Sequence, residues 1–176
     1  MKSVIFKTAL SLLIALALVC CAGCAKKKSS TDGPSPEGED FTFALGSAEG
    51  KAGEDVEIPL TIRSNPSIAG YSVTVCYDPA VLTFKSCDNK VSGGFAVTNS
   101  TVPGKVRVMC TVMGGNALAH EGVCDLLTFT VKEDAPAGTS TLELILADSA
   151  DAIYKTENGK MPSVECILEQ GSVTVK

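Results

Sequence analysis

The chain has 176 residues, 45% of them hydrophobic, and a formal net charge of −5 at neutral pH. This length and composition suit one folded domain with a sizeable core. An acidic chain of this kind excludes a nucleic-acid-binding protein, because the phosphate backbone repels it.

The first 24 residues have the three parts of a secretory signal. Lys2 and Lys7 make the start positive, an apolar run broken only by Ser11 covers residues 9–19, and small residues precede Cys24. The apolar run is too short to span a bilayer comfortably, which favours an export signal over a membrane helix.

The end of this signal resembles the bacterial lipobox, the sequence that a lipoprotein signal peptidase recognises. Ala22-Gly23-Cys24 matches it, whereas Cys21 stands where an aliphatic residue is usual. The resemblance implies that residues 1–23 are a lipoprotein signal peptide and that Cys24 carries the lipid. The alternative is simple secretion, with Cys24 an ordinary thiol or lost with the signal.

Residues 24–40 are predicted to be a lipid-anchored flexible linker. Lys26, Lys27 and Lys28 follow the predicted lipid site, where an anionic membrane surface attracts them, although a role in orienting the signal during export also explains them. Residues 29–40 are rich in Ser, Pro, Gly and acid and cannot bury a core. We therefore expect an extracytoplasmic, surface-exposed protein, lipid-anchored to the bacterial cell membrane by a tether whose residues 29–40 span about 4 nm at most.

Residues 41–176 are the predicted folded domain. Ten lysines and arginines against sixteen aspartates and glutamates give it a net charge of −6. Its five cysteines are an odd number, so at least one is unpaired or pairs between molecules, and no Cys-x-x-Cys zinc motif occurs among them. We expect mostly buried thiols and leave open one disulfide, whose pair the spacing does not identify. The cysteines are Cys76, Cys87, Cys110, Cys124 and Cys166.

Hydrophobic and polar residues alternate along this domain, and Gly or Pro regularly interrupts the alternation. A period of two places one side of a strand in a core and the other in water. Residues 46–53 are predicted to form a turn, and no stretch has the period of a long amphipathic helix. The pattern predicts an all-β fold, a nine-stranded antiparallel β-sandwich with jelly-roll topology. The clearest predicted strands are 41–45, 56–62, 71–77, 106–112, 127–131, 142–146 and 173–175.

Five motifs follow one another along the predicted domain. The first two are a Gly-x-x-Gly turn that leads into a proline-containing strand, and an alternating strand that ends Tyr-Asp-Pro-x-x-Leu. The others are a Leu-x-Phe-x-Val-Lys strand, an Ala-x-x-Gly turn and a closing Gly-x-Val strand. They lie at 50–60, 68–82, 122–132, 135–138 and 171–175. In this order, the chain resembles a cohesin domain, the receptor module of cellulosomes, over the whole of residues 41–176.

The resemblance implies a partner and a binding face. Cohesins bind dockerins, which are small calcium-loaded helical modules of glycoside hydrolases and related enzymes. They use one sheet face, built here from strands 71–77, 106–112 and their neighbours. Cohesins often carry Asn and Asp at the positions of Gly70 and Ser72, so in this chain the partner preference differs or the interaction is absent. The outward residues of this predicted face are Gly70, Ser72, Thr74, Cys76, Arg107, Met109, Thr111 and Met113.

We expect this face to be open to solvent, and cover by the chain itself would contradict the prediction. Met109 and Met113 either form an adaptable contact surface or, if a bulge reverses their phase, fill the core. Cys76 is expected to point outward at the end of its strand.

No catalytic, metal or cofactor site is predicted. The acidic residues lie in no recognisable catalytic setting, and His120 lies in a Gly- and Ala-rich loop without a nucleophile motif nearby. Asp148, Asp151 and Glu157 lack the regular spacing of an EF-hand. The sequence therefore predicts a binding protein rather than an enzyme.

Three functions remain open. The first, which the resemblance favours, is a membrane-tethered receptor that anchors dockerin-bearing, polysaccharide-degrading enzymes at the cell surface. The second is a carbohydrate-binding module, although the chain has no Trp and Tyr71 and Tyr77 are predicted to face inward, which leaves Tyr154 for stacking on sugar rings. The third is a structural or adhesion domain of a surface assembly.

Overall fold

The computed structural model describes residues 40–114, 116–147 and 149–176. This part of the chain consists of twelve strands with turns and loops between them, and no helix in it is long and apolar enough to cross a membrane. The predicted signal peptide, Cys24 and nearly all of the linker lie outside the described residues. The strands are β1 (Thr42–Leu45), β2 (Ser47–Gly50), β3 (Asp55–Arg63), β4 (Gly70–Cys76), β5 (Leu82–Asn89), β6 (Gly94–Asn99), β7 (Lys105–Val112), β8 (Gly122–Val131), β9 (Gly138–Ile145), β10 (Ala152–Tyr154), β11 (Ile167–Glu169) and β12 (Gly171–Val175).

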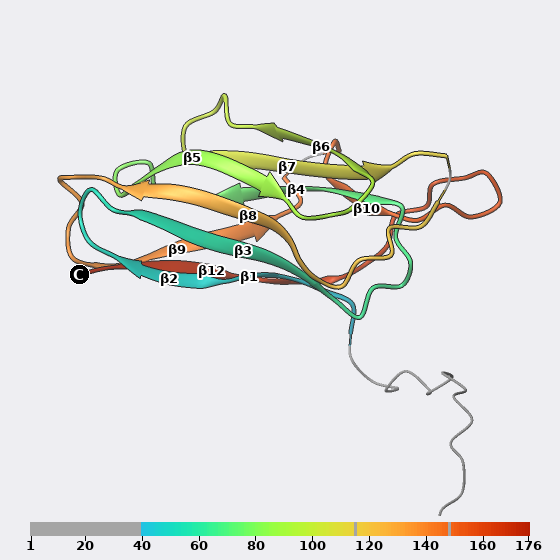
Figure 1. The fold of residues 1–176 in the computed structure, drawn as a ribbon, viewed down its shortest axis with the longest axis horizontal. Coiled ribbons are helices and arrows are strands. Elements are labelled where there is room, and N and C mark those ends of the chain that lie inside the picture. Colours follow the sequence, from blue (N-terminus) through green and yellow to red (C-terminus); the bar gives the residue numbers. More distant parts are fainter. Residues whose placement is uncertain (1–39, 115, 148) are drawn as a thin grey trace, which may run out of the picture. The chain divides into compact units, whose positions relative to one another are not determined.

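The strands form two sheets that pack face to face (Figure 1). One sheet has the order β11-β1-β3-β8-β5, and the other has the order β2-β12-β9-β4-β7-β6, with β10 paired to β4. The chain passes repeatedly between the two sheets, as in a jelly roll. The predicted all-β sandwich is confirmed. The details differ from nine antiparallel strands: the first and last strands are each split in two where they change sheets, β10 is added, and the β1–β11 and β2–β12 pairs are parallel, which gives twelve strands in the described residues.

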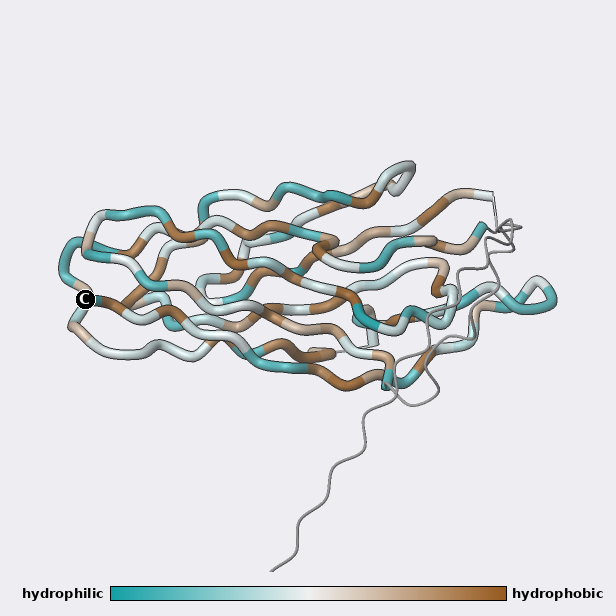
Figure 2. The backbone as a smooth tube through the Cα atoms, turned by 60° about the horizontal axis from the view of Figure 1, so that its bottom comes forward, coloured by the Kyte–Doolittle hydropathy of each residue, from teal (hydrophilic) through white to brown (hydrophobic). Residues whose placement is uncertain are grey.

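The core between the sheets follows from the period-two alternation. On β3, Val56, Ile58, Leu60 and Ile62 are buried, while the residues between them are partly or fully exposed. Figure 2 shows hydrophobic and hydrophilic residues alternating along the strands in the same way. Burial stabilises the fold by about 25 cal/mol per Å² of apolar surface, so the alternation determines which side of each strand faces inward.

The first and last strands cross from one sheet to the other at the same place. β1 continues as β2 through Gly46, and β11 leads into β12, which begins at Gly171. The Gly46 amide donates to the Pro59 carbonyl (2.8 Å), and a Cβ on Gly46 would lie 2.6 Å from the Pro59 Cγ. The Pro59 ring therefore leaves no room for a side chain at Gly46. The predicted turn over 46–53 is wrong for Ser47–Gly50, which pairs with β12 as a strand.

A buried polar network links the two sheets. Asp125 on β8 is fully buried and accepts hydrogen bonds from the Tyr71 hydroxyl of β4 (2.6 Å) and from the Asn89 side-chain amide (2.8 Å). Burial raises the pKa of the Asp125 carboxyl, and the hydrogen bonds from Tyr71 and Asn89 lower it in part. Tyr71 thus faces inward, as predicted, and its hydroxyl finds its partner on the opposite sheet.

Replacing Gly171 by alanine tests the crossing. A Cβ there would lie 2.9 Å from the Leu45 Cβ and closer still to the Gly46 carbonyl oxygen, so the backbone must shift. We expect Gly171→Ala to lower the free energy of unfolding by about 1–3 kcal/mol, measured by urea denaturation. The control is Ser172→Ala, which removes only an exposed hydroxyl contact with Ser47. Equal midpoints for the two variants would contradict this account.

Candidate partner-binding face

The predicted binding face is the outer surface of β10, β4, β7 and β6. Directly opposed residues of antiparallel strands point to the same side of a sheet. The register of these strands therefore creates four outward rows across the face. The rows are Tyr154–Gly70–Thr111–Phe95, Ala152–Ser72–Met109–Val97, Thr74–Arg107–Asn99 and Cys76–Lys105.

Asp151, in the segment between β9 and β10, covers the β4 part of this face. Its carboxylate accepts hydrogen bonds from the Ser72 hydroxyl (3.0 Å) and the Thr74 hydroxyl (2.6 Å). The carboxylate also accepts a hydrogen bond from the Ala147 amide (2.8 Å), and its Oδ1 lies 2.7 Å from the Nε of Arg107. The Asp151 side chain is fully buried, whereas 28% of the Arg107 side chain remains exposed.

The expectation of an open face is therefore wrong for Gly70, Ser72 and Thr74. Ser72 and Thr74 lie on the outer side of β4 as predicted, but the segment before β10 buries them. Gly70 lies under Tyr154: a Cβ on Gly70 would be 2.5 Å from the Tyr154 hydroxyl oxygen, and this hydroxyl donates to the Thr111 hydroxyl (2.7 Å). Alternation predicts the direction of a side chain, but it does not predict whether another segment covers it.

Four apolar side chains remain exposed beside the covered part. The exposed fractions are 64% for Phe95 and 40% for Val97 on β6, 38% for Met109 on β7, and 74% for Met113 just after β7. Val97 lies directly opposite Met109, and Phe95 lies opposite Thr111. The two methionines are thus on the surface and not in the core. We call Phe95, Val97, Met109 and Met113 the apolar strip.

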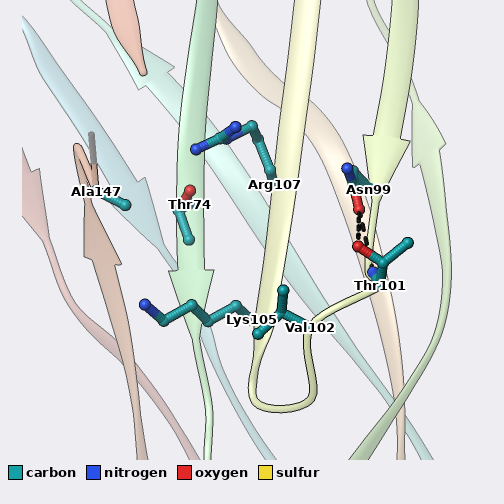
Figure 3. Close-up of a pocket in the computed structure, with 7 residues that line it drawn as sticks. All are labelled: Thr74, Asn99, Thr101, Val102, Lys105, Arg107 and Ala147. Atoms are coloured by element: carbon teal, nitrogen blue, oxygen red, sulfur yellow. Dashed lines mark hydrogen bonds between the residues drawn. The ribbon is translucent and has the colours of Figure 1, made fainter. Parts of the chain in front are cut away.

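A pocket of about 300 Å³ lies towards the other end of β7 (Figure 3). Lys105 extends across it towards Ala147, and the Asn99 side-chain oxygen accepts hydrogen bonds from the amide and the hydroxyl of Thr101 (3.0 and 2.9 Å). Cationic, amide and hydroxyl groups together suit a small anionic group such as a carboxylate. The lining residues are Thr74, Asn99, Thr101, Val102, Lys105, Arg107 and Ala147.

The described residues do not assemble a metal site. Outside residues 1–39, 115 and 148, no three His, Cys, Asp or Glu side chains are placed to hold a metal ion together. His120 is half-buried, and its Nε2 lies 2.8 Å from the Val123 carbonyl oxygen. Asp151, considered from the sequence as a calcium ligand, is engaged by the hydroxyls of β4.

The five cysteines of residues 41–176 are free thiols. Cys110 and Cys124 are buried, and the other three are half-buried. Desolvation raises the pKa of the Cys87 thiol to about 12 and of the Cys166 thiol to about 11, and it also raises the pKa of Cys76 on the outer side of β4. Thiols with raised pKa hold little thiolate at neutral pH, so they are poor nucleophiles.

Exposed aromatic rings are scarce in the part of the chain that the structure describes. Among the described residues, Phe95 is the only aromatic side chain that is largely exposed. Tyr71 is buried, Tyr154 is half-buried, and Tyr77 packs against Phe129 with ring centroids 5.1 Å apart. A single ring is no platform for stacking several sugar units.

Replacing Asp151 by alanine tests the cover over β4. The change removes the shared acceptor of Arg107 and two hydroxyls, so we expect the free energy of unfolding to fall by about 2–3 kcal/mol. The Ala147 amide, which donates to Asp151, should exchange with deuterium faster. Asp134→Ala, at an exposed position, is the control and should change stability by less than about 0.5 kcal/mol. Wild-type stability and Ala147 exchange in Asp151→Ala would contradict this account.

Comparison with known proteins gives a family model and several relatives. The family model of the cohesin domain matches residues 41–175. Cellulose-binding protein A of Clostridium cellulovorans is 27% identical over 160 residues, which cover 84% of this chain and only 8% of that protein. The seventh ScaB type I cohesin from Pseudobacteroides cellulosolvens has a TM-score of 0.68 and 21% identity, covering 77% of this chain and 92% of that one. The sixth cohesin of scaffoldin B from Acetivibrio cellulolyticus, solved with a Cel5 dockerin, has a TM-score of 0.65 and 20% identity, covering 78% and 100%.

The solved structures share the sandwich fold of this chain, and the family model covers nearly all of its described residues. Cohesin domains are non-catalytic modules, which confirms the prediction that the chain is not an enzyme. The sequence motifs, the two-sheet fold and the family match agree: the chain belongs to the cohesin domain family.

Proposed function

We propose that this chain is a cell-surface receptor that binds dockerin-bearing proteins and so anchors polysaccharide-degrading enzymes. The match of residues 41–175 to the cohesin family carries this proposal. A relative with the same fold was solved in complex with a dockerin, which supports a dockerin as the partner here. The receptor performs no reaction; it supplies a surface to which the enzyme-bearing partner binds.

The outer face of the seven-stranded sheet supports a role in protein binding. β4 pairs with β7 over Gly70–Cys76, and β6 pairs with β7 over Gly94–Asn99. The exposed side chains of β6 and β7 are therefore positioned before a partner arrives. A preorganised surface loses little conformational entropy on association, which favours affinity.

The same proposal includes a lipid anchor at Cys24, with residues 24–40 as the tether. The small residues before Cys24 support processing by a lipoprotein signal peptidase, and the lysines at 26–28 support contact with an anionic membrane surface. A single acyl chain gives only marginal membrane binding, so a basic patch next to it adds a second attachment.

Dockerin binding can be measured with the full chain. We expect a one-to-one complex with a calcium-loaded dockerin cloned from a secreted enzyme of the encoding organism, detected by titration calorimetry. Chelation of calcium should abolish the complex, because the resemblance implies that dockerins are calcium-loaded. Incubation with insoluble cellulose, xylan and starch is the control and should leave the chain in solution. Retention on a polysaccharide without dockerin binding would point to a carbohydrate-binding module, and binding to neither would point to an adhesion domain.

Cys24→Ser tests the anchor. In the encoding bacterium, we expect the wild-type chain to incorporate a labelled fatty acid and to sediment with membranes, because the Cys24 thiol is the predicted acylation site. The Cys24→Ser variant should lose both properties. Cys20→Ser, a thiol change within the same signal, is the control and should keep them. Labelling of Cys24→Ser, or no label on the wild-type chain, would overturn the anchor.

A further inference from the structure

The hydrogen-bonding groups at the centre of the outer face are already engaged within the domain. The Ser72 and Thr74 hydroxyls donate to Asp151, and the Thr111 hydroxyl accepts from Tyr154. A partner that used these groups would have to break such contacts, and each buried polar group left unsatisfied costs about 1–3 kcal/mol. The β4 part of the face is therefore unsuited to polar recognition of a partner.

The apolar strip beside it has the dimensions of a short helical contact. Strand residues rise about 3.3 Å each, so Met109 and Met113 are about 13 Å apart along the chain direction. A helix rises 1.5 Å per residue and covers this length with about nine residues, or two to three turns. Apolar side chains at helix positions i, i+4 and i+7 lie on one side of such a segment. Exposed apolar patches of this kind mark protein-binding surfaces.

A lysine lies on β7 beyond the Met109 end of the apolar strip, and we call this end of the face the polar end. Lys105, at the start of β7, is exposed and forms no ion pair with any described residue, whereas Arg107 is held by Asp151. The outward residues of β4, β6 and β7 include no carboxylate. Glu143, on β9, lies in the same row as Cys76 and Lys105, and no ion pair joins its carboxylate to Lys105. In a domain of net charge −6, this end of the face therefore attracts an acidic side chain.

We propose that the partner docks on the apolar strip of β6 and β7, with an apolar helix surface over Phe95, Val97, Met109 and Met113 and a carboxylate at Lys105. This inference rests on the proposed dockerin-binding function and assigns the chemistry of the dockerin that this chain selects. Such a dockerin presents aliphatic or aromatic side chains to the strip. A dockerin that bound an uncovered β4 surface would need polar side chains instead. Contact is thereby displaced from β4 towards the edge strand β6.

Charge introduced into the strip tests the proposal. We expect Phe95→Glu and Met113→Glu in the full chain to weaken binding of the calcium-loaded dockerin about 30-fold or more, as for central hydrophobic anchors of an interface. Both side chains are more than half exposed, so thermal unfolding should stay close to that of the wild-type chain. Val123→Glu is the matched control, because Val123 is 39% exposed on the five-stranded sheet. It should change the Kd less than about twofold, as expected away from an interface.

A second pair of variants tests the polar end. Lys105→Glu should weaken binding about 5- to 10-fold and reduce its dependence on salt, because an attraction becomes a repulsion. Lys51→Glu makes the same charge change in the exposed turn after β2, at the opposite edge of the sheet from β6, and should bind like the wild-type chain.

Each outcome is distinct. If the wild-type chain binds no dockerin, the proposed function fails and this inference fails with it. If the wild-type chain binds a dockerin but the strip variants bind equally well, the inference is wrong and the proposed function stands. If sedimentation shows that the chain alone forms a dimer that Met113→Glu dissociates, the strip is occupied by a second copy of the chain, which overturns the proposal.

Discussion

The buried carboxylate of Asp151 joins three parts of the chain that are far apart in the sequence. One of its oxygens binds the Ser72 hydroxyl and the Arg107 guanidinium, and the other binds the Thr74 hydroxyl and the Ala147 amide. These groups belong to β4, to β7 and to the segment after β9. A carboxylate is stable away from water only where hydrogen bonds and a counter-charge replace its hydration, and both are present here.

The contacts of Asp151, together with Tyr154 over Gly70, divide the outer face into a closed polar half and an open apolar half. Gly70 and Ser72 stand where related domains often have Asn and Asp, and the same positions are covered in this chain. The missing Asn and Asp and the cover over these positions have the same effect on binding. A covered side chain cannot bond a partner, so an amide or a carboxylate at these positions would add nothing to the affinity. The surface left to a partner is the strip that contains Met109 and Met113, whose affinity comes from apolar burial and not from directed hydrogen bonds.

The sandwich could be predicted because β3, β4, β7 and β12 alternate cleanly, whereas alternation left Met109 open between surface and core, and the structure places it on the surface. Strands that depart from this pattern were missed. β5 has a register shift between Phe84 and Ser86, β10 and β11 have three residues each, and the edge strand β6 is almost wholly exposed, so Phe95 and Val97 belonged to no predicted strand. The Asp151 cover was missed because Asp151 follows Ser72 by 79 positions and Thr74 by 77 positions in the sequence. The local periodicity of a sequence carries no information on contacts over such separations.

The parallel pairing of β1 with β11 has a mechanical consequence. β1 is held between β3 and β11, and the chain enters the domain at one end of the sandwich while Lys176 lies at the other (Figure 1). Tension applied through the segment before Thr42 therefore acts along the axis of β1. Backbone hydrogen bonds run across the strands, so such a load shears both ladders at once and does not open them one bond at a time. A domain loaded in shear along β1 ruptures only when many backbone hydrogen bonds fail together, so it resists a steady pull better than a domain whose strands are peeled apart.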